Sequence, residues 1–163
     1  MNIHLGYLPG CIGRIAELHA AYYARTVGFG VAFEAKVASE LSEFCLRCTE
    51  GRDGLWLAIE NGRIHGAIVI DGGHYQKSGA HLRWFITSDE IRGKGVGAKL
   101  LGAAMAFCQT RGYQRVYLWT FDELHAARHL YEKHGFELAR TQRGSQWGKE
   151  VNEQLFVLGE ARP

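Results

Sequence analysis

Apolar residues recur every three or four positions in two long segments near the start of the chain, and this spacing predicts two amphipathic helices. Residues 11–25 place Ile15 and His19 on one helical face, and the next segment repeats Phe33 and Val37 in the same way. The glycine-rich sequence TVGFG separates the two helices. NIHLGYL, which precedes them, is a possible first strand.

Later segments alternate short apolar runs with turn residues, which indicates strands. Two such runs flank Asn61 and Gly62 in LWLAIENGRIHGAIVI, and both residues tolerate the positive φ of a tight hairpin turn. DGGHYQKSGA is predicted to be a loop. The remaining predicted elements are a strand at HLRWFIT, a helix over 96–111, a strand at RVYLWT, a helix over 123–134, and strands over 136–143 and 151–158.

A glycine-rich turn joins the strand HLRWFIT to the helix that follows it. The turn reads RGKGVG and contains Arg92, Gly95 and Gly97. Such a turn directs backbone N–H groups and the positive end of a helix dipole toward one point, which makes an anion site. Its G-x-G-x-G spacing differs from the dinucleotide fingerprint G-x-G-x-x-G, and no Ser or Thr follows Gly-Lys as in Walker A. The pattern that remains is R-x-x-G-x-G.

That pattern resembles the acetyl-CoA-binding motif of the GNAT superfamily of N-acetyltransferases. The order of the predicted elements is similar to that of the family as well. The resemblance implies one α/β domain over residues 1–163, in which a mixed, mostly antiparallel central sheet splays at the cofactor site and has helices on both faces. A second segment, AARHLYEKHGFEL, is similar to another motif of the family, with Ala127, Leu130, Tyr131, Gly135 and Phe136 in place.

The resemblance implies acetyl-CoA as co-substrate. The backbone N–H groups of the glycine turn would hold its pyrophosphate, and the main chain of the preceding strand would bind its pantetheine arm. The implied cofactor-binding residues are Phe85, Ile86, Thr87, Arg92, Gly93, Lys94, Gly95, Val96, Gly97 and Ala98. The family usually has an asparagine seven residues before its tyrosine, and this chain has Leu124 there, so we expect that cofactor contact to be lost or supplied from elsewhere.

Tyr131 is the candidate catalytic residue, because the family pattern places this tyrosine near the cofactor sulfur as general acid. Proton transfer from a phenol with a pKa of about 10 to a thiolate with a pKa of about 8.5 is uphill by only roughly 2 kcal/mol. The same side chain shares an apolar helical face with Ala127, so a buried aromatic residue without a catalytic role is the alternative.

A general base is harder to assign. An amine with a lysine-like pKa near 10.4 is only about one part in 10³ deprotonated at pH 7, so a base or a water chain is needed. The family's usual glutamate positions lie in the strands HLRWFIT and RVYLWT, which hold no carboxylate here. The candidates are Asp122, Glu123, Glu34, His81 or water, and an ordinary surface role is open for each side chain.

Two other spacings raise the possibility of a metal site. His125 and His129 are four residues apart, but Arg128 shares their polar face and no H-E-x-x-H motif is present, so we expect no metal. Cys45 and Cys48 form a C-x-x-C without a second pair, at the end of an amphipathic helix. We expect them to be structural thiols.

Composition narrows the class of protein. The chain has 163 residues, of which 47% are hydrophobic, and this is enough for one compact domain with a core. A formal net charge of +2 without a Lys/Arg block argues against a nucleic-acid partner. The absence of a long apolar run or a signal-like N-terminus argues against a membrane partner, and we expect a cytoplasmic protein.

Among GNAT proteins, the chain most resembles the acetyltransferase domain fused to MarR-type winged-helix regulators, here without the winged helix. The segments on which this resemblance rests include YYARTVGFGVAFEAKVASEL and WGKEVNEQLFVL. Trp147, Gly148 and Gln154 of the second segment are part of the same resemblance. The resemblance implies acetyl transfer to a primary amine of a small molecule or peptide, and a homodimer is a family-level expectation. Direct attack is favoured because no Cys has a convincing His partner in the motifs. The alternative is a non-catalytic acyl-CoA-binding sensor or interaction domain.

Overall fold

The computed structural model describes residues 1–159 and has one seven-stranded sheet, in the order β1-β2-β3-β4-β5-β7-β6. Neighbouring strands are antiparallel except for β4 and β5, so the sheet is mixed and mostly antiparallel. The strands are β1 (Asn2–Leu5), β2 (Gly54–Glu60), β3 (Arg63–Asp71), β4 (Ala80–Thr87), β5 (Arg115–Phe121), β6 (Glu137–Gly144) and β7 (Val151–Gly159). The helices are α1 (Cys11–Val27), α2 (Val31–Arg47), α3 (Tyr75–Ser78), α4 (Val96–Thr110) and α5 (His125–Lys133), with a 3₁₀ turn η1 (Asp89–Ile91).

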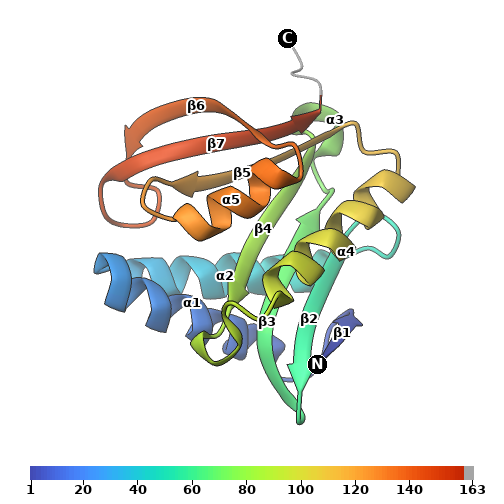
Figure 1. Ribbon diagram of the computed structural model, residues 1–163, viewed down its shortest axis with the longest axis horizontal. Coiled ribbons are helices and arrows are strands. Elements are labelled where there is room, and N and C mark those ends of the chain that lie inside the picture. The colour runs from blue at the N-terminus through green and yellow to red at the C-terminus, as the bar shows by residue number, and fades with distance from the viewer. Residues whose placement is uncertain (160–163) are drawn as a thin grey trace.

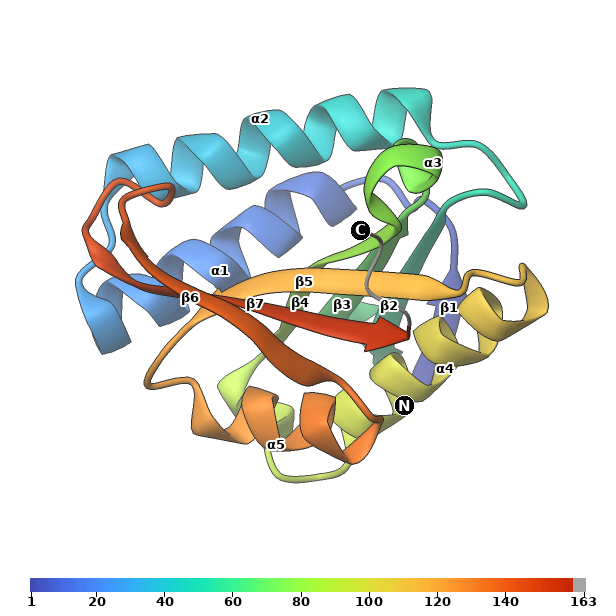
Figure 2. The ribbon, with the colours of Figure 1, turned by 90° about the horizontal axis from the view of Figure 1, so that it is seen from above.

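Helices cover both faces of the sheet, as the resemblance implies. α1 and α2 lie on one face, and α4 and α5 lie on the other (Figures 1 and 2). The apolar spacing read from the sequence identifies the buried stripes, because α1 buries Ile15 and His19, and α2 buries Phe33 and Val37. None of the helices within residues 1–159 is long and apolar enough to cross a membrane.

The predicted hairpin is confirmed. β2 and β3 pair antiparallel around Asn61 and Gly62, whose φ angles are 51° and 73°. Positive φ at both central residues gives a turn with the twist that two-residue hairpins favour. This hairpin lies between the edge strand β1 and the central strand β4.

Three predicted boundaries or segments are wrong in detail. Residues 71–80 contain the one-turn helix α3 in place of a continuous loop, because Tyr75 packs its ring 4.5 Å from that of Tyr113. The helix predicted over 123–134 begins at His125, since Glu123 has a φ of 82°, which is incompatible with a helical turn. α1 also runs two residues farther than expected, to Val27.

β4 and β5 are parallel neighbours for only two residue pairs, Ala80 with Val116 and His81 with Tyr117. Beyond these pairs the strands separate, and they diverge from the end near α3 toward α5 (Figure 1). The splayed sheet that the resemblance implies is therefore present. The free edge of β4 and the space beside it form the site described next.

Candidate active site

A β-bulge lies in β4, beyond the two residues that pair with β5 and within the pairing with β3. Ala67 pairs with Ile86 and Val69 pairs with Arg83, so two residues of β4 stand opposite one residue of β3. One of the two, Trp84, has a φ of 47°, which is uncommon for a bulky residue. A bulge of this kind bends the strand and changes the direction of its side chains and main-chain groups. Pairing with β3 resumes at Ile86 and Thr87.

The first hollow beside β4, here called the glycine cleft, has a volume of ≈ 560 Å³. It lies between the end of β4, the start of α4 and the first two turns of α5, with Tyr22 and Tyr23 of α1 closing one side. Eight of the ten residues expected to bind cofactor line it: Phe85, Ile86, Thr87, Arg92, Gly93, Gly95, Gly97 and Ala98.

The other two expected residues, Lys94 and Val96, are not among the residues that line the cleft. The N–H of Lys94 donates to the carbonyl of Ile91 at 3.2 Å, which closes the turn. The side chain of Val96 is only 4% exposed and packs in the core beneath α4. These two residues therefore support the turn and the core beside the cleft.

The glycines of RGKGVG serve two purposes. Gly93 and Gly95 have φ angles of 79° and 76°, in the left-handed region that L-residues with side chains rarely adopt. Gly97 has no such angle, but a Cβ there would lie 3.4 Å from both Leu130 and Phe85, so its backbone lies against the wall of the cleft. The N–H groups of the first turn of α4 have no intrahelical acceptor and can bind an anion.

Arg92 is held at the rim of the glycine cleft. It donates from Nη2 to the carbonyl of Thr87 at 2.8 Å, it pairs with Asp89, and its Cζ lies 4.3 Å from the centre of the Tyr22 ring. Asp89 also pairs with Arg25 at 2.5 Å. The guanidinium is thus held in position before any ligand binds, with part of its charge already balanced.

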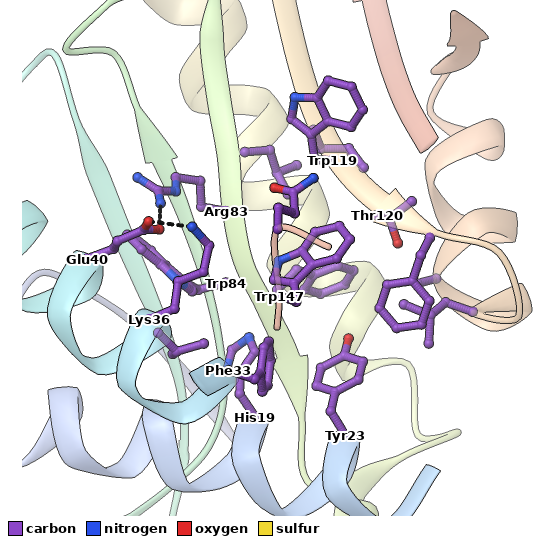
Figure 3. Close-up of a pocket in the computed structure, with 18 of the residues that line it drawn as sticks. His19, Tyr23, Phe33, Lys36, Glu40, Arg83, Trp84, Trp119, Thr120 and Trp147 are labelled. Carbon is purple, nitrogen blue, oxygen red and sulfur yellow. Dashed lines mark hydrogen bonds and ion pairs between the residues drawn. The ribbon is translucent and has the colours of Figure 1, made fainter. Parts of the chain in front are cut away.

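The second hollow, here called the aromatic cavity, has a volume of ≈ 350 Å³ and lies between β4, β5, α1 and α2 (Figure 3). Half of the residues that line it carry rings, and Lys36, Glu40 and Arg83 form a polar end. The ring-bearing residues labelled in Figure 3 are His19, Tyr23, Phe33, Trp84, Trp119 and Trp147.

The two hollows share a wall. Tyr23, Phe85, Leu124 and Ala127 line both of them. Leu124, which stands where the family has asparagine, therefore contributes an apolar side chain to this junction in place of an amide. A ligand in the cleft and a second ligand in the cavity would meet at these four residues.

Tyr131 lies beside the junction and lines the aromatic cavity. The residue is 5% exposed, and its ring centre lies 6.0 Å from that of Phe85 and 5.9 Å from that of Phe136. Burial raises the pKa of its hydroxyl, and the nearby Tyr23 adds to the effect. The phenol is therefore neutral at physiological pH and can donate a hydrogen bond into the cavity.

The sequence offered four side chains as general base, and only one of them lines the aromatic cavity. Glu34 is exposed on α2, and Asp122 accepts a hydrogen bond from Asn152 at 2.7 Å; neither lines the cleft or the cavity. Glu123 lines the glycine cleft. His81 lines the cavity, with its ring stacked 4.5 Å from that of Tyr117, and burial together with Arg83 lowers its pKa to about 3.

His19 also lines the aromatic cavity, and sequence reasoning treated it only as part of an apolar helix face. Its Nδ1 lies 2.8 Å from the carbonyl oxygen of Ile15. Because a carbonyl can only accept, Nδ1 carries the proton. Burial lowers the pKa of the ring to about 4, so the imidazole is neutral and Nε2 is an acceptor. The only sequence signal was a histidine among apolar positions.

A buried carboxylate shapes the turn that closes the cavity. Glu153 is 2% exposed and accepts hydrogen bonds from the Gln142 side chain and the Gln146 backbone N–H, each at 3.0 Å. Burial alone would raise its pKa, but these hydrogen bonds outweigh that effect and lower it. They fix the turn over residues 144–150, from which Trp147 reaches the cavity, 5.5 Å from Phe121.

The histidine pair and the cysteine pair that raised the possibility of a metal site lie in different parts of the structure. His125 and His129 both line the glycine cleft. Cys45 is half-buried and Cys48 is exposed, and both are free thiols. Within residues 1–159 there is no group of three or more His, Cys, Asp or Glu side chains placed to hold a metal ion.

Comparison with known proteins gives one family. A sequence model of the acetyltransferase (GNAT) family matches residues 14–136. N-alpha-acetyltransferase 30 of Schizosaccharomyces pombe is 32% identical over 85 residues, which are 50% of this chain and 55% of that protein. The chain thus spans about half the length of the curated relative it matches.

Two solved structures have a similar fold. An acetyltransferase from Streptococcus agalactiae has a TM-score of 0.72 at 17% identity, with 97% of this chain and 98% of that chain covered. A GNAT family acetyltransferase from Elizabethkingia anophelis, solved with acetyl-CoA bound, has a TM-score of 0.69 at 13% identity, with 98% and 97% covered. At these identities the similarity shows the fold.

Proposed function

The chain belongs to the acetyltransferase (GNAT) family, and from this premise we propose that it transfers the acetyl group of acetyl-CoA to a primary amine of a small molecule or peptide. The observation that carries the proposal is the junction at Tyr23, Phe85, Leu124 and Ala127. It joins a cleft suited to a nucleotide-linked thioester with a separate cavity of small-molecule size. A cytoplasmic location and a homodimer remain part of the proposal.

The chain's own groups fit acetyl-CoA. The first-turn N–H groups of α4, together with those of Gly93 and Gly95, would bind the pyrophosphate, and Gly97 leaves room for it. Hydrogen bonds to a charged group contribute about 1.5–3 kcal/mol each, so a few are sufficient for micromolar affinity. The unpaired edge of β4 from Phe85 to Thr87 would bind the pantetheine arm by its main chain.

Direct attack of the amine on the thioester is the proposed route. All four cysteines of the chain lie within residues 1–159, and none of them lines the glycine cleft or the aromatic cavity. No thiol is therefore placed to take the acetyl group first. The amine would enter from the aromatic cavity and reach the acetyl carbon at the junction.

The proton of the amine needs an acceptor. An ammonium with a pKa near 10.4 costs about 4 to 5 kcal/mol to deprotonate at pH 7. We propose Nε2 of His19 as that acceptor, directly or through water, because no residue within 1–159 donates a hydrogen bond to it and its tautomer is fixed by Ile15. His19 joins His81, Asp122, Glu123, Glu34 and water as candidates, and its place in the cavity favours it over the carboxylates.

Tyr131 would stabilise the departing thiolate. The raised pKa of its hydroxyl makes full proton transfer more costly than for an ordinary phenol, so donation of a hydrogen bond is the main contribution that we propose. Tyr131 lines the aromatic cavity next to Phe85 of the junction, and the sulfur would leave there.

Two coupled measurements test this function. Isothermal titration with acetyl-CoA measures the affinity of the cleft, and a free-thiol release assay over a panel of amines measures transfer. We expect micromolar binding, and a 10- to 100-fold lower kcat in Tyr131→Phe with the KM for acetyl-CoA unchanged. Tyr7→Phe, at an exposed position, is the matched control and keeps the wild-type rate.

A different result would favour the second candidate function, a non-catalytic acyl-CoA-binding sensor or interaction domain. The low pKa values of His19 and His81 support it, because a base that is so weakly basic accepts a proton reluctantly. Binding of acetyl-CoA without thiol release from any amine would assign that function. The similarity to MarR-fused domains is compatible with either candidate.

A further inference from the structure

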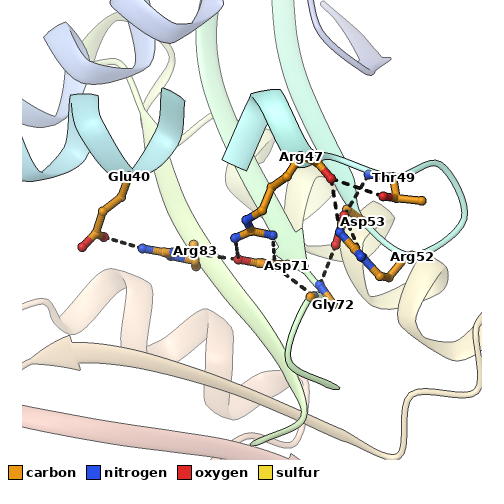
Figure 4. Close-up of polar contacts among 9 residues, drawn as sticks. Glu40, Arg47, Thr49, Arg52, Asp53, Asp71, Gly72 and Arg83 are labelled. Carbon is orange, nitrogen blue, oxygen red and sulfur yellow. Dashed lines mark hydrogen bonds and ion pairs between the residues drawn. The ribbon is translucent and has the colours of Figure 1, made fainter. Parts of the chain in front are cut away.

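A chain of alternating charges begins at the polar end of the aromatic cavity and continues into a neighbouring hollow. We call it the charge ladder, and it consists of Lys36, Glu40, Arg83, Asp71 and Arg47 in that order (Figure 4 shows it from Glu40 to Arg47). Lys36 Nζ lies 2.7 Å from Glu40, Arg83 pairs with Glu40 and lies 3.5 Å from Asp71, and Arg47 lies 2.6 Å from Asp71. The ladder has three cations and two anions.

The excess positive charge lies on the cavity side of the ladder. Among the residues that line the aromatic cavity, the formal charges are those of Lys36, Glu40 and Arg83, because His19 and His81 are neutral. Their sum is +1. Beyond Arg83, a neighbouring hollow is lined by Glu43 and by the Asp71–Arg47 pair, so the cationic excess does not continue there.

The donors at this end of the cavity are not all used. Both carboxylate oxygens of Glu40 already have a cation, Oε1 with Lys36 and Oε2 with Arg83. Lys36 has three donors and Glu40 as its partner among the described residues. Arg83 Nη1 is 3.5 Å from Asp71, which is too long for a good hydrogen bond.

Arg83 is also held in a fixed direction. Its side chain is 19% exposed, and its Cζ lies 4.1 Å from the centre of the Trp84 ring, at the bulge of β4. A positioned guanidinium with free donors, next to an ammonium, binds a carboxylate more readily than it admits another cation. The partnered Glu40 offers little to an incoming ammonium.

We propose that the acetyl acceptor is an amine that also carries an acidic group, as an amino acid does. Its carboxylate binds between Lys36 and Arg83, its apolar part packs on the rings of the cavity, and its amine points to the junction with the glycine cleft. This inference rests on the proposed function. In the transfer, the amine nitrogen forms a bond to the acetyl carbon, the carbon–sulfur bond breaks, the amine loses a proton to His19 or water, and the thiolate of coenzyme A is released.

Matched substrate pairs test the acidic group. Phenylalanine is compared with phenylalaninol, and 5-aminopentanoic acid with 5-aminopentanol, so that each pair differs only by a carboxylate in place of a hydroxymethyl group. We expect kcat/KM to be at least 10-fold higher for the acid in one or both pairs. An equal or higher value for both alcohols, or for 1,5-diaminopentane, would overturn the inference and leave the proposed function intact.

Two substitutions shift the acid-to-alcohol ratio in opposite directions. Lys36→Met removes a cation and keeps the aliphatic stem, and we expect the ratio to fall about 10-fold. Glu40→Gln frees both cations, and we expect the ratio to rise. Lys77→Met, on the exposed part of α3, is the matched control and leaves the ratio unchanged. A fall of the ratio in Glu40→Gln would contradict the proposal.

Failure of the proposed function is recognised separately. If acetyl-CoA binds but no amine releases thiol, titration of the same pairs into the protein with coenzyme A still measures the preference of the cavity. Tighter binding of the acids supports the inference, and equal or weaker binding overturns it. Loss of acetyl-CoA binding itself would refute only the proposed function.

Discussion

The glycine cleft and the aromatic cavity lie side by side along β4, but they present polar groups of different origin. The cleft offers main-chain groups, from the unpaired edge of β4 and the first turn of α4. The cavity offers side chains from α1, α2, β4, β5 and the turn over residues 144–150. Several segments line each hollow, but the main-chain groups expected to bind the cofactor come from the continuous stretch 85–98, whereas the polar side chains of the cavity come from separate helices and strands.

This difference indicates that the fold determines the cofactor site, whereas the acceptor site can vary with the side chains. A main-chain site depends on the path of the backbone, and any sequence with glycines at the required positions can form it. A side-chain site can be altered at single positions while the backbone stays the same. We therefore expect substitutions to affect either acetyl-CoA or the acceptor, according to the hollow that they face.

The largest expected effect is on the charge ladder. Asp71→Asn leaves Arg47 and Arg83 without their carboxylate, and we expect the free energy of unfolding to fall by about 3 kcal/mol in urea titrations. Acetyl-CoA affinity of the folded variant should stay within threefold of the wild type. Asp89→Asn, in an exposed ion pair, is the control and costs less than about 1 kcal/mol.

The pH dependence of this contribution has a defined sign. Burial would raise the pKa of Asp71, but the hydrogen bonds from Arg47 and Gly73 outweigh it and lower the pKa to about 2. The folded pKa lies below the unfolded value, so the stabilisation is present above about pH 4 and is lost as the pH falls toward 2. Equal stability losses in Asp71→Asn and Asp89→Asn would contradict this account.

Gly97→Val should affect the cleft alone. The larger side chain would meet Leu130 and Phe85, and would occupy space beside the first-turn N–H groups. We expect the Kd for acetyl-CoA to rise about 100-fold, or about 2.7 kcal/mol, by isothermal titration. Gly102→Val on the same helix has open space around it and should leave the Kd within twofold. A similar Kd for the two variants would show that Gly97 does not border the ligand.

His19 makes the free energy of unfolding depend on pH. Its folded pKa of about 4 lies below the ordinary value of 6.5, so the unfolded chain binds more protons between these values and stability falls as the pH is lowered. Between pH 7 and 5 we expect His19→Leu to lose about 2 kcal/mol less than the wild type in denaturant titrations. An unchanged pH dependence would mean that His19 is not neutral and buried.

The smallest expected effect concerns Glu153, a positioning residue for the turn of Trp147. Glu153→Gln weakens the hydrogen bonds to Gln142 and Gln146, and we expect the acceptor KM to rise about threefold with the KM for acetyl-CoA unchanged. Glu150→Gln, exposed on the same turn and paired with Arg143, is the control. A change in the KM for acetyl-CoA would contradict the expectation that Glu153 affects only the aromatic cavity.

The sequence predicted those parts of the molecule that local rules determine. The hairpin at Asn61 and Gly62 and the glycine-rich turn before α4 follow from turn chemistry, which acts over a few residues. The splayed sheet was predicted from the resemblance of two motifs to those of the GNAT family. Eight of ten expected cofactor residues line the cleft. Val96 packs in the core instead and the N–H of Lys94 closes the turn, which the motif alone does not predict.

The remaining features depend on contacts between distant segments. The bulge at Trp84 has no glycine or proline to mark it. The pair between Glu40 and Arg83 spans 43 residues of sequence, and neither helix nor strand periodicity predicts it. His19 looks like any core histidine until the carbonyl of Ile15 fixes its tautomer.

The two-pair contact between β4 and β5 also has a mechanical consequence. Hydrogen bonds from Arg115 to Ser78 and from Gln114 to Tyr75 reinforce that end, whereas side chains alone join β4 to β5 at the other end. A cofactor bound along the free edge of β4 would bridge that gap and support one wall of the aromatic cavity. We therefore expect the two substrates to bind in order, with acetyl-CoA first.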